Sequence, residues 1–151
     1  MPIESDALAG LVGTELGPSD WLEIRQERID EFADVTEDHQ FIHVDPVAAA
    51  RTPFSSTIAH GFLTLSLLTR LVGPLRPSLP GTVMGLNYGL ERVRFLTPVK
   101  VGSHIRGRAA VRAVTERAPG RWVITYAVTI DIEGEERPAL VADWLTMTVV
   151  E

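Results

Sequence analysis

Residues 36–46, TEDHQFIHVDP, bring acidic groups and imidazoles together with apolar side chains. The apolar positions favour burial, whereas a plain core segment would exclude the charged ones. A solvated loop would not need the apolar residues. The segment therefore predicts a site where polar groups react beside an apolar surface that excludes water. The groups in it that can transfer a proton or bind a metal are Asp38, His39, His43 and Asp45.

A metal site is the first chemistry to weigh. His39 and His43 are four residues apart, which imitates the zinc-binding spacing H-E-x-x-H. The position of the general base in that motif is occupied by Gln40, which cannot accept a proton. Pro46 and the apolar residues also indicate a loop rather than a long helix. We therefore predict no metal at this segment.

Two other interpretations of the segment stay open on the residues alone. In the structural one, Asp38 caps a helix, His43 is a buried and satisfied histidine, and Asp45 is the N-cap of the next helix. In the catalytic one, a turn aims Asp38 and His43 at one point, where they share a water as an acid–base pair. His39 is expected to face solvent in either case.

A second segment, TIAHGF at residues 57–62, directly precedes the most apolar stretch of the chain. A helix N-terminus presents backbone N–H groups and a partial positive charge. Gly61 has no side chain to block an approaching group, so its N–H could bind a developing oxyanion. Alternatively, Gly61 only permits close packing of the helix. His60 is expected to cap that helix.

The elements that must position these residues divide the chain into a helical half and a strand-rich half. Residues 60–72 are apolar on nearly every side, which predicts a long buried helix. The second half alternates and has tight turns, so it predicts an antiparallel meander. The fold class is therefore α+β: one central helix wrapped by a curved antiparallel sheet of about five strands, the hotdog arrangement. The expected helices are 3–11, 26–38, 45–52 and 60–72, and the expected strands are 20–24, 82–96, 104–117, 121–132 and 138–150.

The totals restrict the class of protein. The chain has 151 residues, enough for one domain, and a net charge of −6 without a run of basic residues, which argues against nucleic acid as a partner. It has no cysteine, and its N-terminus lacks the features of a signal peptide. The longest apolar stretch is too short and too polar to span a bilayer. We therefore expect a cytoplasmic protein that needs no membrane.

Two segments resemble a known family. FADVTEDHQFIHVDPVAAARTPFSSTIAHGFLTLSLL, residues 32–68, resembles the hydratase motif of (R)-specific enoyl-CoA hydratases in the MaoC-like dehydratase family. NYGLERVRFLTPVKVGS, residues 87–103, resembles the strand and turn that follow the helix there. The similarity covers residues 17–150, and residues 1–16 would be an N-terminal extension with a short helix. The resemblance implies one hotdog domain over residues 1–151.

The resemblance also implies roles for individual residues. It places the catalytic aspartate at Asp38, the catalytic histidine at His43 and the oxyanion-binding amide at Gly61. The family commonly has Asn-Pro where this chain has Gln40 and Phe41. Gln40 can still form hydrogen bonds, but the loop loses the rigidity of proline and Phe41 could reshape the pocket. Further positions expected to support the site are Gln40, His60, Thr69, Asn87 and Tyr88.

The implied activity is that of a hydro-lyase, which adds water to a trans-2-enoyl-CoA to give an (R)-3-hydroxyacyl-CoA. No metal or redox cofactor is needed, and coenzyme A enters as part of the substrate. Arg51, Arg92 or Arg94 could meet its phosphates. The alternatives are a thioesterase of the same fold and a non-catalytic acyl-binding subunit. Because the sheet has open edges, a homodimer through residues 87–95 is expected.

Overall fold

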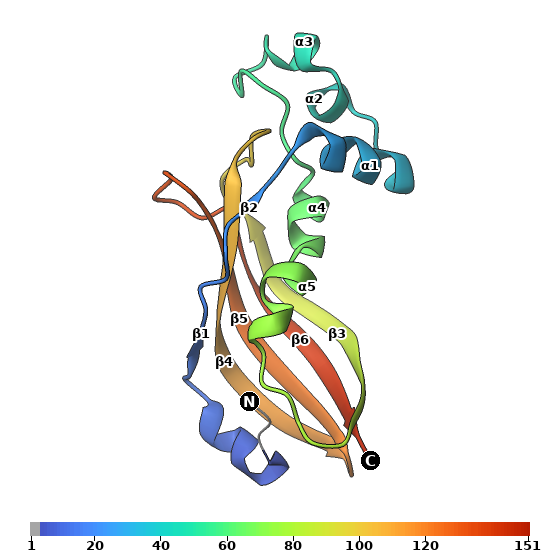
Figure 1. The fold of residues 1–151 in the computed structure, drawn as a ribbon, viewed down its shortest axis with the longest axis vertical. Helices are drawn as coiled ribbons and strands as arrows, with labels where there is room; N and C mark the ends of the chain where they lie inside the picture. Colours follow the sequence, from blue (N-terminus) through green and yellow to red (C-terminus); the bar gives the residue numbers. More distant parts are fainter. Residues whose placement is uncertain (1–3) are drawn as a thin grey trace.

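The computed structural model describes residues 4–151, and a curved antiparallel sheet dominates it (Figure 1). The strand order is β1-β4-β5-β6-β3, and β2 also pairs with β4. The sheet has six strands, two of them only two residues long. The strands are β1 (Glu15–Leu16), β2 (Leu22–Glu23), β3 (Thr82–Phe95), β4 (His104–Ala118), β5 (Arg121–Ile132) and β6 (Leu140–Val150).

Alternation explains the long strands. In β5, every second side chain from Ile124 to Ile132 is buried, and the residues between them are partly exposed. This is the period of two that a pleated strand gives to its faces. The β4–β5 hairpin turns at Gly120, whose φ of 72° suits glycine. A Cβ there would also lie 2.4 Å from the carbonyl oxygen of Val150, so the turn packs against the end of β6.

The central helix lies against the concave side of the sheet (Figure 1). It consists of α4 (Gly61–Ser66) and α5 (Leu68–Leu71), followed by the short 3₁₀ helix η2 (Gly73–Leu75). Its approach to the sheet is close, because a Cβ on Gly107 of β4 would lie 2.8 Å from Cγ2 of Val72. The predicted α+β fold, a central helix wrapped by a curved antiparallel sheet, is confirmed.

The helix differs from the prediction in two respects. It is interrupted at Leu67, where the backbone tightens and the N–H of Arg70 bonds to the carbonyl of Leu67 at 3.0 Å. It is also not buried on every side: Phe62 is 68% exposed and Arg70 is exposed. The reason is geometric, since the sheet covers only one side of the helix. The buried side consists of Leu63, Leu67, Leu68, Leu71 and Val72.

A helical cap covers the end of the molecule where α4 begins (Figure 1). It contains α1 (Gln26–Thr36), α2 (Phe41–Val44) and α3 (Pro46–Ala49). As expected, Asp45 caps α3, accepting hydrogen bonds from the amides of Val47 and Ala48 at 3.1 and 3.0 Å. The one-turn helix α2 was not predicted. Helix α1 ends as expected, at Glu37, which adopts a left-handed conformation with φ of 60°.

The N-terminal segment runs along one edge of β4, where β1 and β2 pair with it. Residues 1–3 of the predicted extension and helix lie outside the described residues. Within the rest of that prediction, a 3₁₀ helix, η1 (Ser5–Leu11), precedes β1. The predicted strand at 20–24 is present as the shorter β2, whereas β1 was not predicted.

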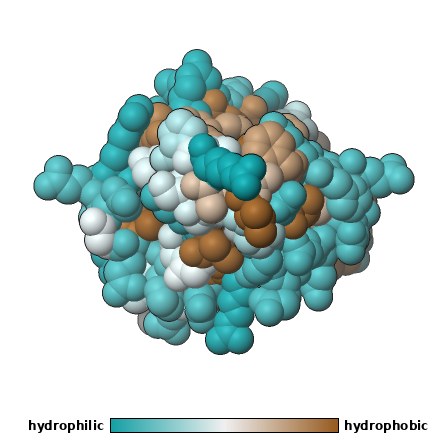
Figure 2. Space-filling model, turned by 90° about the horizontal axis from the view of Figure 1, so that it is seen from above, coloured by the Kyte–Doolittle hydropathy of each residue, from teal (hydrophilic) through white to brown (hydrophobic). Residues whose placement is uncertain are grey.

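Two exposed apolar regions stand out. The first is the edge strand β3, which among residues 4–151 pairs only with β6 and leaves most of its side chains exposed. The second is the helical cap, where brown apolar atoms lie among hydrophilic ones when the molecule is seen from above (Figure 2). Val35, Phe41 and Val47 of that cap are 80%, 46% and 71% exposed. Between residues 4 and 151, no helix is long and apolar enough to cross a membrane.

Candidate active site

His43 is a buried imidazole at the inner side of the helical cap. It is the third residue of α2, and only 6% of its surface is exposed. Its Nδ1 lies 2.7 Å from the carbonyl oxygen of Ile58. Because a carbonyl can only accept, Nδ1 carries the proton and donates. In the neutral ring, Nε2 is therefore left with a lone pair that can accept a proton.

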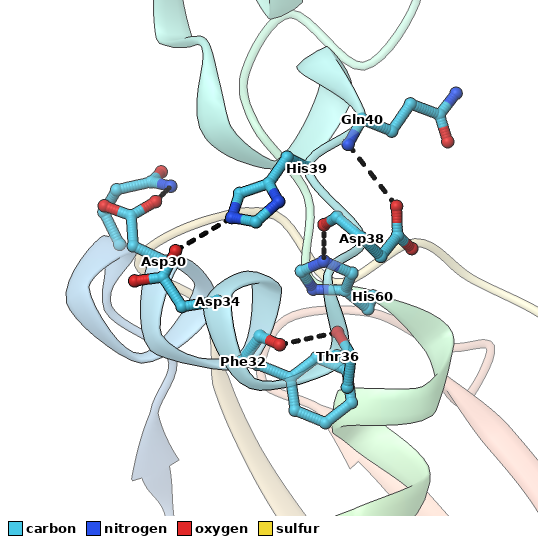
Figure 3. Close-up of polar contacts among 9 residues, drawn as sticks. Asp30, Phe32, Asp34, Thr36, Asp38, His39, Gln40 and His60 are labelled. Atoms are coloured by element: carbon cyan, nitrogen blue, oxygen red, sulfur yellow. Dashed lines mark hydrogen bonds and ion pairs between the residues drawn. The ribbon is translucent and has the colours of Figure 1, made fainter.

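Asp38 reaches the same place from the end of α1. It is exposed, and one carboxylate oxygen lies 3.4 Å from the amide nitrogen of Gln40 (Figure 3). One carboxylate oxygen of Asp38 and one ring nitrogen each of His43 and His60 all lie within 4.8 Å of one another. The turn between α1 and α2 thus brings Asp38 and His43 together, as the catalytic interpretation requires. The side chain of Gln40 points away from His60 (Figure 3).

His60 contacts both His43 and Asp38. Its ring stacks on that of His43, with the centroids 3.8 Å apart and the planes 22° apart. Its Nε2 donates to the backbone carbonyl of Asp38 at 3.0 Å (Figure 3). His60 occupies the N-cap position of α4, but its side chain makes no capping bond, so the expected capping role is wrong. Its Nδ1 is buried and has no hydrogen-bond partner within residues 4–151.

The surroundings keep His43 neutral. Burial is the main cause of its lowered pKa, because removal from water disfavours the imidazolium. The bond to Ile58 raises the pKa, the neighbouring His60 lowers it, and the Asp38 carboxylate raises it. The net direction is downward from the ordinary value of 6.5. His43 can therefore accept a proton at neutral pH, and a carboxylate lies beside it.

The cluster suits proton transfer better than metal binding. The lone pairs of an imidazole lie in the plane of its ring, and a metal must approach to about 2.1 Å along that plane. The nearly parallel, stacked rings of His43 and His60 cannot both meet this condition for one ion. The zinc-like pair does not form either. His39 points to the outside of α1, where its Nε2 lies 2.8 Å from Asp34 (Figure 3).

Gly61, the predicted oxyanion donor, begins α4 directly after His60. It borders a cavity of about 170 Å³, together with Thr64 and Phe95 among others. The Phe95 ring lies so close that a Cβ on Gly61 would be 3.1 Å from its Cδ1. A side chain at this position would therefore need the Phe95 ring to shift by a few tenths of an ångström.

Three predicted supporting residues lie further along the molecule, Thr69 on the central helix and Asn87 and Tyr88 on β3. Thr69, Asn87 and Tyr88 line a groove of about 460 Å³ between the helix and β3. Asn87 accepts a hydrogen bond from Nε1 of Trp144 at 3.1 Å. Thr69 follows Gly61 by eight residues, a distance of about 12 Å along a helix. The structure thus places these residues in a groove beside the helix and not in the acid–base cluster.

The arginines proposed for coenzyme A have different surroundings. Arg92 is bound to the buried Asp143 of β6, with Nε to Oδ2 at 2.8 Å. Arg94 donates to the backbone carbonyl of Val93. Arg51 follows α3 and is exposed. Arg92 therefore has a structural partner already, whereas Arg51 and Arg94 form no ion pair with a carboxylate of the described chain.

Sequence reasoning missed two residues beside the site. Gln26, the first residue of α1, donates from Nε2 to the carbonyl oxygen of His43 at 2.7 Å. Thr57 donates its hydroxyl proton to Oε1 of Gln26 at 2.5 Å. Gln26 lies 17 residues before His43, and no local motif links the two. Only the packing of α1 on α2 shows the contact.

Comparison with known proteins shows the family and the fold of the chain. Residues 8–132 match the family described as "MaoC like domain". The chain is 53% identical to Nodulation protein N of Rhizobium leguminosarum bv. viciae, over 90% of this chain and 85% of that one. It is 46% identical to 3-hydroxyacyl-thioester dehydratase Z of Mycobacterium tuberculosis, over 90% and 89% of the two chains. The (R)-hydratase of A. caviae superposes with a TM-score of 0.74 at 27% identity, covering 89% of this chain and 94% of that one.

The fold and these relatives define a hydro-lyase of hotdog architecture. The chain belongs to the MaoC-like dehydratase family, as the resemblance in its sequence indicated. Its activity is therefore that of a hydratase or dehydratase.

The lowered pKa of His43 predicts a pH dependence of stability. The unfolded chain binds a proton at His43 near pH 6.5, while the folded chain binds it only at lower pH. The free energy of unfolding should therefore fall as the pH drops below about 6.5, towards the folded pKa. Urea titrations of the wild type and of His43→Gln at several pH values measure this contribution. If the free energy of unfolding depended on pH equally in both proteins, the lowered pKa would be contradicted. An NMR titration that gave His43 a pKa of 6.5 or higher would contradict it as well.

Proposed function

We propose that the protein is an (R)-specific enoyl-CoA hydratase, which reversibly adds water to a trans-2-enoyl-CoA and yields an (R)-3-hydroxyacyl-CoA. The observation that carries the proposal is the meeting of Asp38 with a neutral, buried His43 directly beside the start of α4. Relatives named 3-hydroxybutyryl-CoA dehydratase and (R)-specific enoyl-CoA hydratase, 33% and 34% identical over part of the chain, support the thioester substrate.

The proposed chemistry follows from these positions. Asp38 and Nε2 of His43 together bind a water and remove one of its protons as its oxygen attacks C3 of the enoyl group. The electrons of the double bond move to the thioester oxygen, where the N–H of Gly61 stabilises the developing charge. The acid–base pair then returns the proton to C2, so that one water is added in total. No metal or redox cofactor takes part.

His60 and the groove complete this proposal. Through its stack on His43 and its bond to the carbonyl of Asp38, His60 fixes the separation of the acid–base pair. The acyl chain would enter the groove that Thr69, Asn87 and Tyr88 line beside the central helix. That groove is largely apolar but offers hydroxyl and amide groups, as sites for small molecules commonly do.

Assay with crotonyl-CoA tests the function directly. We expect loss of the absorbance of the conjugated thioester without release of free thiol. The product should be oxidised poorly when it is coupled to an (S)-specific 3-hydroxyacyl-CoA dehydrogenase and NAD⁺. Strong NADH formation would contradict the (R) product. Thiol release would instead identify a thioesterase, and the absence of both reactions would favour an acyl-binding subunit.

Substitution of the acid–base pair tests the site. Asp38→Asn and His43→Ala should each lower kcat by about 10²–10⁴-fold, the usual contribution of a general acid–base group. Asp34→Asn and His39→Ala are matched controls, because they change the same residue types in an exposed pair, with Asp34 on α1 and His39 just after it. Near-normal turnover in both site variants would refute the assignment, as would equal losses in the controls.

We further propose that the protein works as a homodimer through β3. This strand has an unpaired edge. Its residues Val83, Met84, Leu86, Tyr88, Leu90 and Phe95 are 43–51% exposed. An open apolar edge favours pairing with a second copy, which would continue the sheet and cover the flank of the central helix.

A charge on this edge should separate the two copies. Light scattering coupled to size exclusion should give twice the mass of one 16.6 kDa chain for the wild type. Leu86→Arg should shift the protein to monomer and lower its activity, because a desolvated charge opposes association. Val47→Arg, at an exposed apolar residue of α3, serves as the control and should remain dimeric. A fully active wild-type monomer would refute the dimer.

A further inference from the structure

His43 is attached to the protein at two points besides its own helix. Nδ1 of its ring donates to the carbonyl of Ile58 at 2.7 Å, and its backbone carbonyl accepts from Nε2 of Gln26 at 2.7 Å. The two attachments come from different parts of the chain: Gln26 begins α1, and Ile58 lies in the segment that leads to α4. The imidazole thus depends on both segments for its position.

The same glutamine also binds the second of these segments. Oε1 of Gln26 accepts the hydroxyl proton of Thr57 at 2.5 Å, and Thr57 is only 1% exposed. Thr57 directly precedes Ile58, whose N–H in turn donates to the carbonyl of Ile42 at 3.0 Å. The bonds therefore form a closed ring through α1, α2 and the segment before α4.

The orientation of the Gln26 amide is fixed by its three partners. Its NH₂ group donates to the carbonyl of His43 and to Oδ1 of Asp30 at 2.9 Å, and neither of these can donate in return. Its oxygen faces the hydroxyl of Thr57. A donor is needed on one side and an acceptor on the other, so an amide fits where a carboxylate or an aliphatic side chain does not.

Helix α2 needs this external support. It has only four residues, and an isolated helix of that length has no stability of its own. No side chain caps its N-terminus. Its position is therefore set by what binds it from outside, and Gln26 binds the very residue that carries the imidazole.

We infer that Gln26 and Thr57 are positioning residues for the hydration reaction, which hold the His43 imidazole against Asp38 and do not touch the substrate. The inference rests on the function proposed above. A displacement of about 1 Å in an acid–base group can cost about 10²-fold in rate. Loss of the hydrogen bonds from Gln26 to His43 and from Thr57 to Gln26 should therefore lower kcat about tenfold or more. The KM for crotonyl-CoA should stay within about twofold of the wild-type value.

Paired substitutions separate positioning from general stability. Gln26→Leu removes all three hydrogen bonds of the amide, and Gln26→Glu removes the donors to His43 and Asp30 but keeps the acceptor for Thr57. Thr57→Val removes the hydroxyl at nearly constant shape, whereas Thr57→Ser keeps it and should restore kcat. Thr52→Val is the matched control, because the Thr52 hydroxyl also donates, to the carbonyl of Ala49 at 2.6 Å, but has no link to His43.

Two readouts decide the outcome. Steady-state kinetics give kcat and KM, and ¹⁵N NMR of the imidazoles reports whether Nδ1 of His43 still carries the proton bound to Ile58. We expect low kcat and an altered His43 signal in Gln26→Leu and Thr57→Val, with Thr57→Ser and Thr52→Val close to the wild type. Unchanged kcat and an unchanged signal in Thr57→Val would overturn the inference, as would equal losses in Thr52→Val.

The NMR measurement keeps this test separate from that of the function. A wild type that hydrates no enoyl thioester would refute the proposed function. The His43 signal in the same variants would still show whether Gln26 and Thr57 hold the imidazole in place, and an unchanged signal would then overturn the inference. If Gln26→Leu does not fold, Thr57→Val and Thr57→Ser decide between the outcomes alone.

Discussion

The hydrogen bond from Nδ1 of His43 to the carbonyl of Ile58 is the interaction on which the site depends. A buried imidazole without a partner for its N–H would be costly, so this bond is a condition for placing His43 inside the protein. It also selects the tautomer whose Nε2 has a lone pair for chemistry. The same bond joins the helical cap to the segment that enters α4, and thereby brings Asp38, His43 and Gly61 into one region.

The packing of the central helix on the sheet determines where this region lies. Its buried side packs so closely on β4 that Gly107 has no room for a side chain, and this contact fixes the height of α5 above the sheet. Helix α4, one turn nearer the cap, therefore begins at a defined place below α2. The other side of the helix is left beside the edge strand β3, with the groove between them. The open side of the fold and the proposed acyl site are thus consequences of a sheet that covers only half of the helix.

Stacking and burial set the electrostatics of the pair. His43 is buried, with His60 stacked on one face of its ring, and burial is the main cause of its lowered pKa. Asp38, by contrast, is exposed to solvent. A buried imidazole with a lowered pKa and an exposed carboxyl group are therefore adjacent, in two different environments. The two groups differ because the His43 ring is buried against His60, whereas Asp38 is exposed.

Much of this protein could be read from its sequence. The alternation in residues 121–132 predicted β5 with its boundaries, and Asp45 followed by Pro46 predicted the capped start of α3, because these signals are local. The motif around Asp38 and His43 identified the family and predicted that these two side chains meet, since they lie only five residues apart.

The tertiary structure decided the rest. Gln26 and Thr57 lie 31 residues apart, and neither has a motif, so only the docking of α1 on α2 makes them partners. His60 was expected to cap a helix, but it stacks on His43 because the cap folds back over the N-terminus of α4. Residues 60–72 are apolar on nearly every side in sequence, yet one side of the helix is exposed, because the extent of the sheet determines which side is covered. Local patterns specify what an element is, whereas its neighbours depend on contacts between distant segments that no local pattern records.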